Sequence, residues 1–226
     1  SKIRKTIKKF KKERKIFDND FSNNIKKRLN YELTNDQTNA LNEINKDLKS
    51  EEKMFRLLQG DVGSGKTIVA LISCLNVVNS GYQVAFMAPT EILAYQHYKL
   101  AQSLIKDKMK IGFLTSKTDY SERKKIINDL ETNEIKILFG THSVFQEKIN
   151  YKKLGLVVID EQHKFGVKQR KKLSDKGGKN CDVLVMSATP IPRTMIMTVF
   201  GDMDVTIIKQ KPKNRKPVKT YSKVDT

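Results

Sequence analysis

Eight consecutive residues of this chain have the types and spacing that bind a phosphate group. Residues 60–67 read Gly-Asp-Val-Gly-Ser-Gly-Lys-Thr and match the pattern G-x-x-x-x-G-K-[ST] at every specified position. Glycines let a loop turn its backbone N–H groups towards an anion, and a helix N-terminus adds partial positive charge. We therefore expect Lys66 to reach the β- and γ-phosphates of a nucleotide and the Thr67 hydroxyl to hold Mg²⁺.

The flanking sequence favours this interpretation over an ordinary glycine-rich turn. An apolar run at residues 55–58 predicts a buried strand before the loop, and residues 66–78 predict a helix after it. Strand, glycine loop and helix in that order are the context in which the pattern binds nucleotides. The expected nucleotide site comprises Gly60, Asp61, Val62, Gly63, Ser64, Gly65, Lys66 and Thr67.

Two adjacent carboxylates follow another apolar run. Residues 156–159 are Leu-Val-Val-Ile, and Asp160 and Glu161 come directly after them. In phosphate-loop enzymes an acidic residue at such a strand end holds the Mg²⁺ ion, and we assign that role to Asp160. Glu161 is placed to orient the attacking water or accept its proton. Without a phosphate loop in the same chain, a surface turn would be the simpler interpretation of this pair.

Seven apolar runs alternate with helix-compatible segments along the chain. The expected strands are residues 55–58, 83–88, 110–114, 135–139, 154–159, 182–186 and 204–208. The expected helices are residues 66–78, 90–105 and 121–131, preceded by one that Thr34 caps and Gln37 completes as a capping box. This alternation predicts an α/β fold, a mostly parallel sheet with helices on both faces. Open α/β sheets bind ligands at the carboxyl ends of strands, so the motifs should share one rim.

The helix expected at residues 90–105 carries several large apolar residues. Those expected to face the sheet are Ile92, Leu93, Tyr95, Leu100 and Leu104.

Lysine-rich segments flank the main domain, which we place at residues 31–208. Residues 1–30 hold 12 basic and 3 acidic residues, and residues 209–226 form a lysine-rich tail. Four apolar residues of the first segment share one narrow helical stripe: Ile3, Ile7, Phe10 and Phe17. We expect a basic connecting helix that docks on the domain or on a neighbour, with nucleic-acid or membrane-surface contact as the alternative.

The overall charge favours a polyanionic partner. The 226 residues carry 44 Lys and Arg against 25 Asp and Glu, a net charge of +19. Nucleic acid is the first candidate, although codon bias that fills solvated surfaces with lysine is the alternative. Cys74 and Cys181 lie in apolar segments and are expected to be reduced core residues. No apolar run approaches the length that spans a bilayer, so no membrane partner is expected.

Three of these motifs resemble motifs I, II and III of superfamily 2 helicases in order and approximate spacing. They are the phosphate loop, Asp160-Glu161-Gln162-His163 and Ser187-Ala188-Thr189. The sequence segments around them resemble the RecG family of bacterial branch-migrating helicases. These segments are residues 59–67, 88–97, 140–142, 160–170 and 188–194. The resemblance covers about residues 33–220, the first helicase lobe. Transcription-repair coupling factors share much of it, but Gln162 and His163 favour RecG.

This resemblance implies a RecA-like domain that binds ATP and Mg²⁺ and, in the family, acts on branched double-stranded DNA in fork reversal and branch migration. It implies that Gln37 reads adenine, that His163 couples nucleotide state to the third motif, and that Ser187 and Thr189 link hydrolysis to strand movement. Arg193 receives no role. The positions matching DNA-backbone contacts are Pro89, Thr90, Gly140, Thr141 and His142.

The family's wedge domain and second helicase lobe have no counterpart in this sequence, so we expect a longer parent protein in the bacterial cytoplasm, associated with the nucleoid. The second lobe supplies the arginine finger, so weak nucleotide binding and very slow hydrolysis are expected of these residues alone. Two alternatives stay open: the equivalent lobe of a coupling translocase, and a nucleotide-dependent DNA-binding module that does not hydrolyse ATP.

Overall fold

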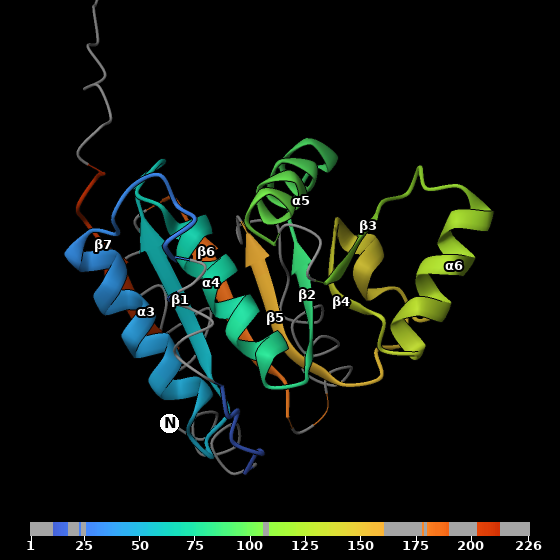
Figure 1. Cartoon of the computed structure of the whole chain (residues 1–226), viewed down its shortest axis with the longest axis horizontal. Helices are drawn as coiled ribbons and strands as arrows, with labels where there is room; N and C mark the ends of the chain where they lie inside the picture. Colours follow the sequence, from blue (N-terminus) through green and yellow to red (C-terminus); the bar gives the residue numbers. More distant parts are fainter. Residues whose placement is uncertain are drawn as a thin grey trace, which may run out of the picture.

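The chain builds one seven-stranded β-sheet, which we describe from a computed structural model (Figure 1). The structure describes residues 11–17, 23, 26–105, 109–160, 178, 180–189 and 203–212. The strand order is β3-β4-β2-β5-β6-β1-β7, and every pairing between these strands is parallel. The strands are β1 (Phe55–Gly60), β2 (Gln83–Met87), β3 (Lys110–Leu114), β4 (Ile135–Gly140), β5 (Leu154–Asp160), β6 (Asp182–Ser187) and β7 (Asp204–Ile208).

The helices that connect these strands begin and end close to the predicted positions. They are α4 (Lys66–Asn79), α5 (Glu91–Ile105) and α6 (Tyr120–Glu131). Helix α3 (Asn35–Leu48) precedes β1 and begins after the predicted cap, whereas the short 3₁₀ helix η1 (His142–Phe145) was not predicted. The capping box at α3 is confirmed, because the Thr34 hydroxyl accepts the Gln37 N–H at 3.2 Å and the Gln37 side chain accepts the Thr34 N–H at 2.9 Å. No helix in the described part of the chain is long and apolar enough to cross a membrane.

Helices cover both faces of the sheet, which confirms the predicted fold class. Val84 of β2 belongs to a buried apolar cluster with residues of α3, α4 and α5, whereas its neighbour Ala85 lies in a second cluster with Ile126 of α6. Successive side chains of a strand point to opposite faces, so β2 is buried on both sides. A strand covered on both faces needs an almost continuous apolar sequence, which is why the strands appear as short apolar runs.

The predicted face of α5 is confirmed at Leu104, which is buried, but is wrong at two other positions. Ile92 is 73% exposed and Tyr95 is 48% exposed, although both were expected to face the sheet. The buried residues of α5 are Ala94, His97, Ala101, Leu104 and Ile105. Alanine side chains are short, so this face packs close to the sheet. A prediction based on the positions of large apolar residues therefore misses a buried face that contains alanines.

The prediction of one helix through residues 1–30 is wrong at residues 11–17, which are extended. The Lys12 N–H donates to the Glu51 carbonyl at 2.8 Å and the Lys15 N–H to the Leu48 carbonyl at 3.2 Å. These bonds to the end of α3 and to the segment after it satisfy both N–H groups without a helix. Phe17 is buried against the core, but not as part of a helical stripe. The other stripe residues, Ile3, Ile7 and Phe10, lie outside the described residues.

A buried ionic cluster fixes the extended segment to the start of β6. The Asp182 carboxylate lies 2.7 Å from the Lys12 ammonium and 2.6 Å from the Lys15 ammonium, and all three side chains are fully buried. The Met54 N–H also donates to this carboxylate, at 2.7 Å. Burial lowers the pKa of Lys12, against the opposing effect of Asp182. The cluster therefore depends on one carboxylate that compensates two lysines.

The two cysteines are buried and unpaired, as expected of core residues. Burial raises the pKa of the Cys74 thiol, and it raises the pKa of Cys181 to about 12. Both thiols therefore stay protonated at neutral pH.

Replacing Asp182 with Asn should destabilise the fold strongly. The change leaves Lys12 and Lys15 buried without a counter-charge, and removing one partner of a buried ion pair costs about 3 to 5 kcal/mol. We expect urea denaturation to report a loss of that size in the free energy of unfolding. Glu51→Gln is the matched control, because it breaks an ion pair of 2.8 Å with Arg14 at the surface. Equal unfolding midpoints for the two variants would contradict the prediction.

Candidate nucleotide-binding site

The loop between β1 and α4 has the backbone geometry of a phosphate cradle. Gly63 and Gly65 have φ angles of 78° and 87°, a left-handed region that favours glycine. A Cβ atom at Gly65 would also lie 2.1 Å from Gln37 Nε2, so a larger residue would displace the Gln37 side chain. Gly65 is therefore required both by the turn and by close packing against Gln37, whereas Gly63 is required by the turn.

Two polar side chains in this loop fit a bound phosphate. Lys66 is 9% exposed, and its ammonium donates to the Gly60 and Asp61 carbonyls at 2.5 and 2.9 Å, within the loop. The Ser64 hydroxyl is buried and makes no hydrogen bond with the described residues. Buried polar atoms are rarely left without a partner, so this hydroxyl indicates a ligand site. The residues present therefore fit a nucleotide phosphate.

Gln37 of α3 supports the phosphate loop directly. Its Nε2 donates to the Ser64 carbonyl at 2.8 Å while its Oε1 serves the capping box, and the side chain is buried. The structure thus places Gln37 beside the loop, and the adenine contact that the resemblance implied stays a prediction. An open pocket of about 420 Å³ runs along the loop. Its lining residues are Tyr31, Gln37, Gly63, Gly65, Lys66, Thr67 and Pro212.

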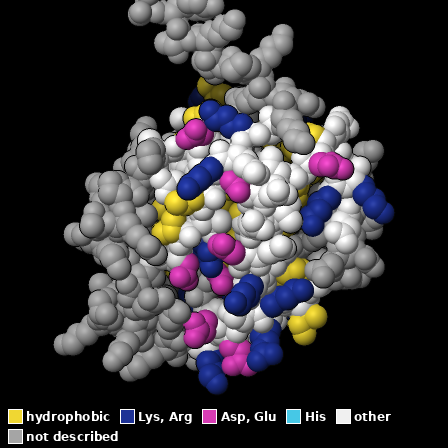
Figure 2. All heavy atoms as spheres, turned by 90° about the vertical axis from the view of Figure 1, so that its left-hand side faces the viewer, with side chains coloured by type: hydrophobic (Ala, Val, Ile, Leu, Met, Phe, Trp, Pro, Cys, Tyr) yellow, Lys and Arg dark blue, Asp and Glu magenta, His cyan; other side chains and the backbone are white. Residues whose placement is uncertain are grey.

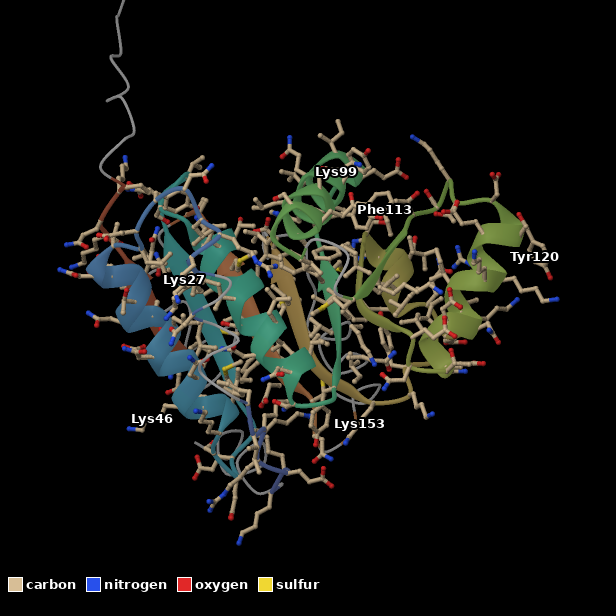
Figure 3. All side chains as sticks on the ribbon, viewed as in Figure 1. Lys27, Lys46, Lys99, Phe113, Tyr120 and Lys153 are labelled. Atoms are coloured by element: carbon tan, nitrogen blue, oxygen red, sulfur yellow. The ribbon has the colours of Figure 1, made fainter. Side chains whose placement is uncertain are left out.

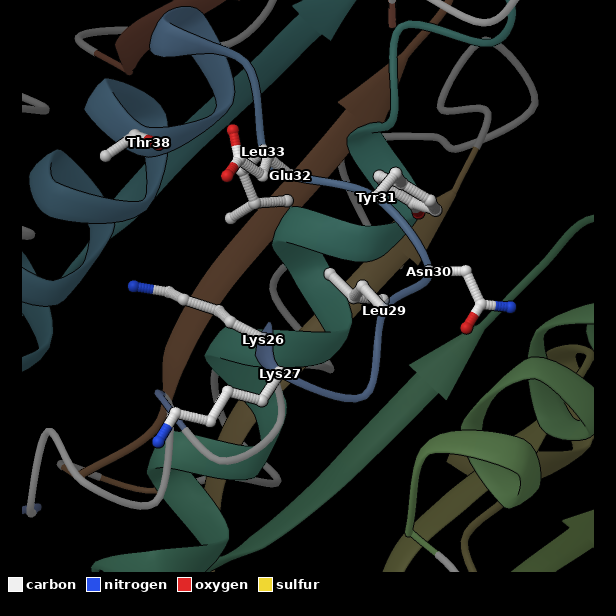
Figure 4. A pocket seen from close by; sticks show the side chains of 8 residues that line it. All are labelled: Lys26, Lys27, Leu29, Asn30, Tyr31, Glu32, Leu33 and Thr38. Carbon is white, nitrogen blue, oxygen red and sulfur yellow. The ribbon is translucent and has the colours of Figure 1, made fainter.

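A second pocket adjoins this one through Tyr31. It has a volume of about 570 Å³ and follows the segment that leads into α3 (Figure 4). Its lining residues are Lys26, Lys27, Leu29, Asn30, Tyr31, Glu32, Leu33 and Thr38. Sequence patterns gave no signal for Tyr31 or Pro212, because neither belongs to the phosphate-loop motif.

The segment after β7 is tied to the start of α3 beside the loop. The Lys209 and Gln210 N–H groups donate to the Asp36 carboxylate at 2.8 and 2.9 Å. These bonds hold the pKa of Asp36 below its usual value, and the bond from Gln210 has the largest effect. Lys211 makes an exposed ion pair of 3.5 Å with Asp61 of the loop. Residues far apart in the sequence therefore meet at one side of the candidate site.

Parallel register brings Lys66 and Asp160 to the same edge of the sheet. Asp160 of β5 pairs with Met186 of β6, and Met186 pairs with Leu58 of β1. Neighbouring strands lie about 4.8 Å apart, so Asp160 lies about 10 Å across the sheet from the strand that leads into the loop. Asp160 and the phosphate loop are thus on one rim, where α/β sheets bind ligands.

Asp160 has a partner that sequence patterns did not indicate. His97 Nε2 lies 2.7 Å from Asp160 Oδ2, and the two side chains are 9% and 11% exposed. A carboxylate can only accept, so the ring nitrogen donates the proton. The available signal was that His97 falls on the same side of the predicted helix as Leu93 and Leu104, but its partner could not be predicted from the sequence.

The residues assigned to coupling lie at the base of the phosphate loop. The Ser187 hydroxyl at the end of β6 lies 3.1 Å from both the Thr189 carbonyl and the Thr189 hydroxyl. Gln59, which immediately precedes the loop, donates to the same carbonyl at 3.4 Å. The ends of β6 and β1 are thereby joined. Three other residues considered from the sequence lie outside the described residues: Glu161, His163 and Arg193.

The residues assigned to DNA follow the neighbouring strands β2 and β4. Thr90 and His142 are exposed, whereas Gly140 is buried, where a Cβ atom would lie 2.0 Å from the Leu114 carbonyl oxygen. Pro89 and Thr141 are half-buried. The Ala88 N–H donates to the Gly140 carbonyl at 3.0 Å and joins the two strand ends. All five assigned residues therefore lie at the rim that carries Asp160.

Comparison with known proteins identifies the class to which this fold and site belong. Residues 34–198 match the family model described as DEAD/DEAH box helicase, so the chain belongs to this family. The predicted resemblance to RecG is also confirmed. The chain is 48% identical to the ATP-dependent DNA helicase RecG of Aquifex aeolicus over 216 residues, which cover 95% of this chain and 27% of that protein.

Other relatives give the same result. Identity to RecG of Thermotoga maritima is 51%, with 86% of this chain and 25% of the relative covered. The solved structure of RecG bound to a three-way DNA junction is 42% identical, with a TM-score of 0.84, and the match covers 96% of this chain and 29% of that one. The DEAD-box helicase Mss116, at 19% identity and a TM-score of 0.66, shares the fold. The chain thus spans less than a third of the RecG proteins it matches.

Replacing Gly65 with Ala should weaken nucleotide binding without unfolding the protein. The added Cβ would meet Gln37 Nε2 at 2.1 Å, so this side chain must move and its bond to the Ser64 carbonyl would be lost. We expect at least an approximately tenfold loss of affinity for a fluorescent ATP analogue, because about 1.4 kcal/mol suffices for that factor.

Gly81→Ala is the matched control for this change. Gly81 has a similar φ of 82°, but nothing lies within 4 Å of its added Cβ. Both variants carry the strain of a left-handed alanine, about 1 to 2 kcal/mol. Only Gly65→Ala should lose nucleotide binding, and equal affinities in the two variants would contradict the role of the loop.

Proposed function

We propose that this chain is the ATP-binding lobe of a RecG-type DNA helicase, which couples ATP hydrolysis to movement on branched double-stranded DNA. The observation that carries the proposal is the position of the phosphate loop and the buried Asp160 on one rim of a RecA-like sheet. Residues 31–208 would form the lobe, and residues 209–226 would lead towards a second lobe. The activity would serve fork reversal and branch migration on nucleoid DNA in the bacterial cytoplasm.

The residues of the rim have complementary roles in this proposal. Lys66 would hold the β- and γ-phosphates of ATP within the loop, and Glu161 would orient the attacking water. Thr67 and Asp160 would hold Mg²⁺, which when bound neutralises charge that develops on the phosphates. The proposed second lobe would add an arginine finger, which contributes about 10³ to 10⁵ in rate in related NTPases.

DNA contact is proposed for the strand ends beside the nucleotide site. Thr90 and His142 are exposed there, and a RecG relative has been solved on a three-way DNA junction. Charge alone is a weaker support. The side of the molecule that carries α3 and β7 mixes acidic and basic side chains and does not form a uniform basic surface (Figure 2). The net charge of +19 therefore favours nucleic acid without marking its path.

Replacing Glu161 with Gln in the full-length helicase would test whether the protein is a motor or a binding module. The amide cannot accept the proton of the attacking water, so DNA-stimulated ATP turnover should fall by about 10² to 10⁴. Nucleotide affinity should remain close to that of the wild type, as measured with a fluorescent ATP analogue.

The control is Glu122→Gln, which makes the same chemical change at an exposed position on α6. It should leave both quantities unchanged. If Glu161→Gln keeps wild-type turnover, Glu161 is not the base. If the wild-type helicase itself shows no turnover, the protein is a binding module.

A further inference from the structure

The bond between His97 and Asp160 connects two parts of the rim that belong to different sequence motifs. Asp160 ends β5, whereas His97 lies in the middle of α5. The donor–acceptor distance of 2.7 Å engages Oδ2 of the carboxylate and leaves Oδ1 outside this bond. The orientation of the Asp160 side chain is therefore set by a residue of another element.

Packing fixes the histidine ring. Phe86 of β2 lies 5.0 Å from it, centroid to centroid, and stacks in turn on Phe139 of β4 at 5.2 Å. His97 is only 7% exposed. A ring held between a strand and its own helix has little freedom to rotate. The position of Nε2 therefore follows the position of α5 on the sheet.

The same helix begins at the exposed rim. The Thr90 hydroxyl accepts the Leu93 N–H at 3.3 Å in the first turn of α5, and Thr90 itself is exposed. His97 follows seven residues later, which places it about 10 Å further along a helix that rises 1.5 Å per residue. On the outer side, Lys99 projects away from the sheet (Figure 3). Helix α5 thus joins an exposed rim residue to the buried carboxylate.

We propose that His97 is a positioning residue for ATP hydrolysis. It orients Asp160 towards Mg²⁺ and makes that orientation depend on α5, so that contact of the Thr90 turn with DNA is transmitted to the metal site. This inference rests on the proposed function, because it requires that Asp160 holds Mg²⁺. The competing explanation is that Asp160 only satisfies a buried histidine, which would affect stability and not metal binding.

The first test measures how Mg²⁺ concentration controls binding of a fluorescent ATP analogue to this chain. His97→Leu removes the N–H donor, and loss of a residue that orients a metal ligand typically costs about 10- to 100-fold in metal affinity. We expect the Mg²⁺ concentration for half-maximal binding to rise by that factor. His97→Gln, whose amide can still donate, should restore most of the wild-type value.

Tyr98→Phe is the matched control on the same helix. It removes a hydroxyl that accepts the Gln102 amide at 2.9 Å and has no contact with Asp160 in the structure. Its Mg²⁺ dependence should equal that of the wild type. The inference is overturned if His97→Leu also shows the Mg²⁺ dependence of the wild type. It is likewise overturned if both His97 variants lose nucleotide binding in the absence of Mg²⁺ and unfold at lower temperature, because that pattern defines a structural role.

Asp160→Asn separates failure of the inference from failure of the proposed function. If it leaves the Mg²⁺ dependence unchanged, Asp160 does not hold the metal and the proposed function fails at this residue. If it abolishes Mg²⁺-dependent binding while His97→Leu has no effect, only the inference fails.

The second test measures transmission from DNA in the full-length helicase. At saturating Mg²⁺, His97→Leu should reduce the ratio of DNA-stimulated to unstimulated ATP turnover at least about tenfold, and His97→Gln should recover it. A wild-type ratio in His97→Leu would overturn the transmission from α5 to Asp160.

Discussion

The parallel direction of the strands is the constraint on which the candidate site depends. Because the described strands all run the same way, their carboxyl ends lie on one edge, and each segment that leaves this edge must return over a face of the sheet. The phosphate loop after β1, Asp160 at the end of β5 and Ser187 at the end of β6 thereby become neighbours. Antiparallel pairing of β1 with β6 would place the loop and Ser187 at opposite edges.

The phosphate loop also depends on residues outside its motif. Gln37 from α3 supports the Ser64 carbonyl, and Thr189 after β6 contacts Gln59 at the base of the loop. The segment after β7 lies on the side of β1 opposite to β6 and is held there by its bonds to Asp36. A change in any of these elements alters the environment of the loop. Such dependence fits the proposed coupling of ATP hydrolysis to movement.

Two buried carboxylates illustrate how the same chemical group can be placed for stability in one part of a sheet and for a proposed metal site in another. Asp182 lies at the amino-terminal edge of the sheet and compensates two lysines of an extended segment, far from the nucleotide site. Asp160 lies at the carboxyl edge, where one oxygen is held by His97 and the side chain stays partly accessible. Asp182 is fully buried with two cations and has no capacity left for a ligand. Asp160 makes a single bond to His97, which leaves its second carboxylate oxygen outside that bond.

Features that follow from short-range rules could be predicted from the residues alone. Apolar runs predicted the strands, and the helix-compatible segments between them predicted the helices. The Thr34–Gln37 pair predicted a helix cap, and the spacing of residues 60–67 predicted the phosphate loop. The partner of Asp160, the exposure of Ile92 and Tyr95 on α5 and the extended path of residues 11–17 depend on contacts between distant parts of the chain. His97 and Asp160 are 63 positions apart, and Lys12 and Asp182 are 170 apart. Strand order and helix packing bring such residues together, and no short-range pattern in one sequence encodes them.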